Sequence, residues 1–107
     1  MSKAMKGIKV TLKNLERSLD NSVRSKTMAS VLLLKREMVL NTPIDTGNAR
    51  ELWKLSETKQ GFVLSNDAEY IEQLNNGSST QAPAFFVEAT AIKYGKPVGS
   101  VIDIDRN

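Results

Sequence analysis

The stretch NTPIDTGNAREL, residues 41–52, decides how this chain folds. It follows a helical pattern and precedes an alternating one. Pro43 pushes the residue before it, Thr42, out of the α region, so a helix has to end there. Asp45 or Thr46 can then start a turn by bonding a nearby backbone N–H, and Gly47 can take a positive φ. The stretch therefore predicts a turn that swings the chain from a helix into a sheet.

Upstream of this turn, side chains recur in steps of three or four, as on one face of a helix. They are Leu12, Leu15, Leu19, Val23, Thr27, Val31, Leu34 and Met38. The spacing predicts an amphipathic helix over Leu12–Leu40, unbroken or with a break near Asn21–Ser22. At ~1.5 Å per residue this helix would be on the order of 43 Å long, more than one small domain covers. We therefore expect part of it to pack against another copy or another protein.

The segment Gly7–Leu12 alternates and contains β-branched residues, so it is either a short strand or the lead-in to the helix. Downstream of the turn, the runs LWKLSET and GFVLSND flank two polar residues and predict a hairpin of two strands. The next run, AEYIEQLNNG, is typical of a short helix or a turned segment. A second helix is predicted around Phe85–Lys93, and the tail PVGSVIDIDRN can add a strand.

These elements predict one α+β domain over residues 1–107, with a long N-terminal helix packed on a small, mainly antiparallel sheet and a second short helix. A core of apolar residues is expected between the helices and the sheet. Its predicted members are Leu15, Leu19, Val31, Leu34, Met38, Trp53, Phe62, Leu64, Ile71, Phe85 and Phe86.

Composition narrows the classes of function. The chain has 107 residues, of which 40% are apolar, and it has neither cysteine nor histidine. That removes disulfides, thiol nucleophiles, histidine bases and nearly all zinc sites. No secretory signal is recognisable after Met1, and the longest apolar run, VLLL, is far short of the ~20 residues of a membrane span. We therefore expect no membrane association.

Charge is spread unevenly along the chain. Residues 1–50 hold ten lysines or arginines and four acidic residues, a net charge of +6. Residues 51–107 hold five and eight, a net charge of −3. A solvated basic helix face explains the first half, and a surface that meets nucleic acid or an acidic partner is the alternative. The aromatic residues that single-strand binders use for stacking are not interleaved with these basic residues.

Candidate catalytic groups do not converge in the sequence. Glu69 and Glu72 lie three residues apart on a possible helix, and Asp67 with Glu69 is a weak candidate for Mg²⁺. Surface helices commonly carry such carboxylates, and the glycines match no phosphate-binding motif. We expect no enzyme activity, no catalytic or metal-binding residue and no cofactor.

The order of short motifs, however, resembles a known family. TPIDTG is followed by Arg50 and the bulky Trp53, then by the hairpin, then by Tyr70 and Glu72, then by NNG, a loop and APAFFVEA. This order is similar to that of the neck and tail-completion proteins, the head-to-tail joining proteins of long-tailed bacteriophages. The similarity covers about residues 12–91. The chain departs from the family pattern after Glu72, where QLNNG stands, at APAFF, and at Pro97, which shortens the last helix.

The resemblance implies a structural virion protein at the head–tail junction or upper tail, made in the host cytoplasm. It implies a ring, a hexamer, that joins or completes the tail and contacts other neck proteins and tail-tube proteins. DNA would pass through the lumen without specific binding. The motif residues then divide into two groups. The structural turn comprises Thr42, Pro43, Asp45, Thr46, Gly47 and Arg50. The possible assembly contacts are Tyr70, Glu72, Pro83, Phe85 and Phe86.

One prediction about the turn follows, and other functions of the protein stay open. Asp45 is expected to bond the backbone or hydroxyl of Thr46–Gly47, or to pair with Arg50. A basic DNA-binding module and a tail terminator or minor tail protein are the alternative functions.

Overall fold

The computed structural model describes residues 7–13, 21–44, 49–59, 61–78 and 84–106. The elements follow in the order β1 (Ile8–Lys13), α1 (Asn21–Asn41), the 3-10 turn η1 (Ala49–Leu52), β2 (Trp53–Thr58), β3 (Gly61–Asn66), α2 (Ile71–Gln73), the π-helical turn η2 (Leu74–Ser78), α3 (Phe86–Gly95) and β4 (Val101–Arg106). The four strands form one sheet in the order β2-β3-β1-β4, and every neighbouring pair is antiparallel. The predicted α+β class with an antiparallel sheet is therefore confirmed.

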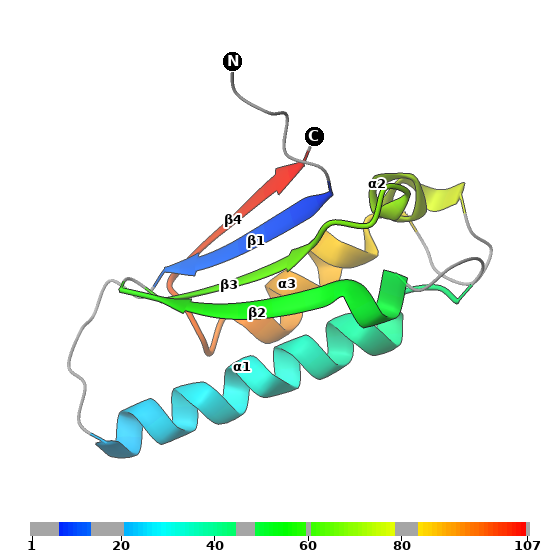
Figure 1. Cartoon of the computed structure of the whole chain (residues 1–107). Coiled ribbons are helices and arrows are strands. Elements are labelled where there is room, and N and C mark those ends of the chain that lie inside the picture. The colour runs from blue at the N-terminus through cyan, green and yellow to red at the C-terminus, as the bar shows by residue number, and fades with distance from the viewer. Residues whose placement is uncertain (1–6, 14–20, 45–48, 60, 79–83, 107) are drawn as a thin grey trace.

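Helices α1 and α3 form a single layer, the helix layer, on one face of the sheet, and α2 lies beyond the end of β3 (Figure 1). Helix α1 lies along the β2 side and α3 along the β4 side, and the two helices pack against each other. The shortest dimension of the molecule is 19 Å, which leaves room for one sheet and one helix layer at ~10 Å each. Within the described ranges, no helix covers the opposite face of the sheet.

Strand β1 corrects the predicted helix start. Leu12 was expected to open the helix, but it lies in β1, where it pairs with Phe62 of β3 and Ile102 of β4. Ile8, Val10 and Leu12 alternate toward the helix layer and are fully buried, because β1 is a central strand. Leu12 fits both periodicities, and the β-branched residues before it favour a strand.

Helix α1 is therefore shorter than predicted and is not the N-terminal element. Its 21 residues span about 32 Å at ~1.5 Å per residue, which fits within the 42 Å length of the molecule. The expectation that the helix is too long for its own domain is wrong. The predicted stripe is confirmed at Val31, Leu34 and Met38, which are completely buried.

Most of the predicted core is confirmed. Trp53, Phe62, Leu64, Ile71 and Phe86 are all buried between the two layers. Phe85 was predicted to join them, but its side chain is 50% exposed. Leu15 and Leu19 lie outside the described residues. β1 and α3 add five more buried apolar residues: Ile8, Val10, Leu12, Val87 and Ala91. Ala49, Ala68, Leu74 and Val98, which lie in other segments, are buried as well.

Gly95 lets α3 approach the sheet closely. A Cβ atom at this position would lie 2.8 Å from Cδ2 of Leu12 and 3.2 Å from Cδ1 of Ile102. Side chains of central and edge strands therefore fill the space that any larger residue at the end of α3 would need. This approach holds α3 against β1 and β4.

Candidate functional site: the groove between α1 and α3

The end of α1 is built around Thr42. Its side chain is fully buried, and its hydroxyl donates to the Met38 carbonyl at 2.6 Å. The same oxygen accepts the indole N–H of Trp53 at 2.8 Å. Because Pro43 prevents another helical turn, the hydroxyl takes the place of a backbone N–H at the Met38 carbonyl, and it ties the helix end to the first residue of β2.

Arg50 closes the same helix end from outside. Its Nε donates to the Thr42 carbonyl at 2.6 Å, and its Nη2 donates to the Leu40 carbonyl at 3.2 Å. A positive charge at the carbonyl end of a helix is also favoured by the helix dipole. Arg50 was predicted to belong to the structural turn, with Asp45 as one alternative partner. The partners in the described structure are the backbone carbonyls of Thr42 and Leu40. Asp45, Thr46 and Gly47 lie outside the described residues.

Helix α3 begins with an unusual cap. Phe85 adopts φ 64° and ψ 34°, a left-handed conformation that is rare for a bulky residue, and it supplies no capping side chain. Asn75 takes over this function from η2. Its Oδ1 accepts the N–H of Val87 at 2.9 Å, and its Nδ2 donates to Glu88 at 2.7 Å. The backbone N–H of Phe85 also donates to the Asn75 carbonyl.

Between these two helix ends lies a groove with a volume of about 410 Å³. Its α1 wall presents Glu37, Leu40 and Asn41. Its α3 wall presents Phe86, Ala89, Thr90, Lys93 and Tyr94, and its closed end holds Thr42, Pro43 and Arg50. A hydrogen bond of 3.3 Å from Asn41 Nδ2 to Thr90 Oγ1 links the two walls.

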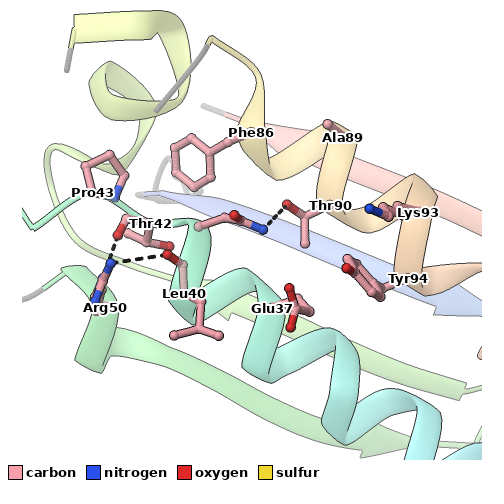
Figure 2. A pocket seen from close by; sticks show the side chains of 11 residues that line it. Glu37, Leu40, Thr42, Pro43, Arg50, Phe86, Ala89, Thr90, Lys93 and Tyr94 are labelled. Atoms are coloured by element: carbon pink, nitrogen blue, oxygen red, sulfur yellow. Dashed lines mark hydrogen bonds between the residues drawn. The ribbon is translucent and has the colours of Figure 1, made fainter. Parts of the chain in front are cut away.

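Charged residues lie toward both ends of the groove, next to apolar and aromatic side chains. Figure 2 shows Pro43 and Phe86 near one end, with Glu37 toward the other end, where Lys93 and Tyr94 lie. The Lys93 ammonium sits 5.3 Å from the centre of the Tyr94 ring. Among the described residues, no ion pair joins Glu37 to Lys93. The groove therefore offers one carboxylate, Glu37, and two cationic side chains, Arg50 and Lys93, next to apolar side chains. This arrangement is suited to binding.

Apolar side chains also surround the groove on its outer side. The exposed large hydrophobic residues of the described part are Leu32, Leu33, Leu40, Ile44, Phe85 and Ile92. All six lie on α1, on α3 or directly beside these helices, and none of them lies on the sheet. The helix layer thus carries an apolar outer surface, whereas the open face of the sheet presents polar residues such as Lys9, Thr11 and Ser65.

The predicted assembly residues are placed as follows. Phe85 is exposed at the start of α3, and Phe86 is buried while its ring lines the groove. Tyr70 and Glu72 are half-buried near α2, and the buried Tyr70 hydroxyl has no hydrogen-bond partner in the described part. Pro83 lies outside the described residues. Among the described members of this group, the structure therefore brings only Phe86 to the groove.

Sequence reasoning missed the capping role of Asn75 and the two walls of the groove. A glutamate three residues after the helix cap, here Glu88, was an available signal for the start of α3. No sequence signal pointed to Asn75, because its partners lie more than ten residues away and depend on the fold of η2.

The fold and the groove together define a two-layer α+β protein with a groove in its helix layer. Comparison with protein-family models, with curated proteins and with solved structures finds no match. None of the described helices is long and apolar enough to cross a membrane. The described residues contain no group of three acidic, histidine or cysteine side chains placed to hold a metal ion.

Proposed function

We propose that this chain is a structural subunit of a virion, at the head–tail junction or upper tail of a long-tailed bacteriophage. In this role it forms a ring, a hexamer by resemblance, that joins or completes the tail. The proposal rests on the resemblance of its motif order to neck and tail-completion proteins. Other neck proteins and tail-tube proteins are the partners that this role implies.

The observation that carries an assembly role is the apolar outer surface of the helix layer. Single exposed apolar residues are common on monomers and need no explanation. Here Leu33, Leu40 and Phe85 are each about half exposed, and they share one layer with Ile44 and Ile92. An apolar surface gathered on one side is typical of a contact with another protein. Neighbouring proteins were first expected because the predicted helix was too long for one domain. The exposed apolar surface is now the reason to expect them.

The turn motif has a structural role within this proposal. Thr42, Pro43 and Arg50 close α1 and fix where β2 begins. They also form the closed end of the groove, so the same residues that set the fold shape the surface offered to a neighbour. Because their polar groups are used within the chain, we propose no catalytic role for them.

The alternative of a DNA-binding module fits the surfaces less well. A helix that reads or follows DNA needs basic and polar side chains on its outer face. The exposed side of α1 mixes Leu32, Leu33 and Leu40 with the basic Lys26 and Arg36, so its basic residues do not form an unbroken surface. On the open sheet face, Lys13 lies 3.7 Å from Asp103, so basic and acidic groups are mixed there. A lumen that lets DNA slide past is compatible with such a mixed surface.

The experiment is the assembly of phage particles without this protein, viewed by electron microscopy. We expect filled heads and separate tails, or tails with an unfinished end, and no infectious particles. Resupplying the wild-type chain should restore joining. Joined, infectious particles in its absence would rule the role out. Salt-resistant, sequence-specific binding of DNA by the purified chain would favour the DNA-binding alternative.

A further inference from the structure

We propose that the free subunit pairs with a second copy of itself through the groove between α1 and α3. The two copies face each other across a two-fold axis that runs along the groove. The inference rests on the proposed role as an assembly subunit, and it names the partner of the apolar surface before assembly. Three features of the groove support a second copy as the occupant.

The first feature is the direction of the two walls. Helices α1 and α3 run in opposite directions along the groove, so that Leu40 lies toward the Phe86 end and Glu37 toward the Lys93 end (Figure 2). A two-fold rotation about the groove axis keeps positions along the groove unchanged and exchanges the walls. It therefore places the α1 wall of each copy over the α3 wall of the other, a self-complementary contact.

The second feature is the charge on each wall. The α1 wall carries the acid Glu37, and the α3 wall carries the base Lys93 at the same end of the groove. Under the two-fold rotation, Glu37 of each copy lies over Lys93 of the other, and the contact occurs twice. Within one chain the two groups form no ion pair in the described structure, so both remain able to meet opposite charges on a partner. An unrelated partner would not need this matching of acid and base.

The third feature is the exposed apolar side chains on the two helices that form the walls. Leu33 and Leu40 are exposed on α1, and Phe85 and Ile92 are exposed at the start of α3 and on it. Of these four, Leu40 lines the groove itself. The same rotation brings the leucines of one copy against the aromatic and aliphatic side chains of the other. Pairing thus removes exposed apolar groups from water on both copies at once.

A two-fold contact closes on itself and cannot build a ring, which requires a contact between two different surfaces. The pair is therefore a state of the free subunit. It covers the apolar surface until the subunit meets its neighbours in the particle. Dissociation of the pair then precedes assembly, which keeps free subunits from associating through this surface in other ways.

The test is sedimentation of the full-length chain over a range of concentrations. We expect a monomer–dimer equilibrium for the wild type. Glu37→Lys and Lys93→Glu each turn two attractive contacts into repulsive ones, and each should weaken the dimer by about tenfold or more. The double variant Glu37→Lys/Lys93→Glu restores opposite charges between copies and should recover dimerisation. Lys54→Glu, on the open face of the sheet, is the matched control and should dimerise like the wild type.

Cysteine cross-linking tests the geometry independently, because the natural chain has no cysteine. Glu37→Cys and Lys93→Cys are made in separate chains, mixed and oxidised. The proposal predicts a disulfide dimer containing one chain of each kind, in excess over dimers of either chain alone. Wild-type protein that stays monomeric at millimolar concentration, or a double charge variant that does not recover, overturns the pairing. Those results leave the ring proposal standing, whereas joined particles made without the protein overturn the ring and not the pairing.

Discussion

Thr42 joins three parts of the molecule through one buried hydroxyl: the last turn of α1, the start of β2 and the closed end of the groove. Replacing Thr42 with valine keeps the shape of the side chain and removes its hydrogen bonds to the Met38 carbonyl and the Trp53 indole. The Trp53 indole N–H is then left buried without an acceptor, so we expect Thr42→Val to lower the free energy of unfolding by about 1–3 kcal/mol. Urea unfolding measures this, with the single tryptophan as the fluorescent probe.

Thr58→Val is the matched control for this change. The Thr58 hydroxyl accepts a backbone N–H in the exposed hairpin turn, where water can replace it, so the loss should stay below about 0.5 kcal/mol. Equal effects of the two variants would contradict the role assigned to Thr42.

Arg50 provides a second prediction at this scale. Arg50→Gln removes the charge and the two-carbonyl contact at the end of α1. We expect a loss of about 1–2 kcal/mol in the free energy of unfolding, because charged hydrogen bonds at a helix end are lost. Arg36→Gln, on the exposed side of α1, should change stability by less than about 0.5 kcal/mol. If the two variants unfold alike, Arg50 does not cap the helix.

At the scale of elements, the strand β1 replaces the first turns of the predicted helix. Leu12→Ala should lower the free energy of unfolding by about 2–5 kcal/mol, because it opens a cavity in a central strand between two layers. Leu32→Ala, on the half-exposed side of α1, should cost less than about 1 kcal/mol. Thermal or urea unfolding compares the two, and similar losses would argue against β1 as a buried central strand.

Asn75 allows a prediction about the start of α3. Asn75→Ala leaves the Val87 N–H and the Glu88 carboxylate without their buried partner. We expect a loss of about 1–3 kcal/mol and faster hydrogen exchange in the first turn of α3. The neighbouring Asn76 is exposed, so Asn76→Ala is the matched control. Unchanged exchange in α3 would show that the helix start does not depend on Asn75.

The sequence predicted those elements whose pattern is local. The alternation around Trp53 and Phe62 predicted the hairpin, and the spacing of Val31, Leu34 and Met38 predicted the buried face of α1. The start of α1 was predicted wrongly, because Leu12 continues the helical spacing as well as the strand alternation. Only its pairing with two other strands decides between them.

The groove was less predictable, for a physical reason. Its walls come from two helices separated by the whole hairpin, so no local spacing relates Glu37 to Lys93. Thr42 and Pro43 were identified as a helix-ending turn, and they also form the closed end of the groove. Phe85 was assigned to the core from its apolar character, whereas the left-handed backbone at this residue turns its side chain outward.

At the scale of the whole molecule, the two faces differ in character. The helix layer exposes leucines and a phenylalanine, and the open sheet face exposes polar and charged side chains. The proposed role requires one face to meet neighbours and another to tolerate solvent or passing DNA. The central claim is that the outer surface of the helix layer is the surface through which the protein assembles in the particle.

The most direct test replaces that surface without unfolding the chain. In Leu33→Lys/Leu40→Lys both changed side chains are about half exposed, so the free energy of unfolding should change by no more than about 1 kcal/mol. Ser56→Lys/Gln73→Lys introduces the same two charges at exposed polar positions on β2 and α2, outside helices α1 and α3. Each variant is supplied to particles that lack the protein, and joined particles are counted by electron microscopy. The account predicts separate heads and tails with the leucine variant and normal joining with the control. Normal joining by a folded Leu33→Lys/Leu40→Lys chain would contradict it.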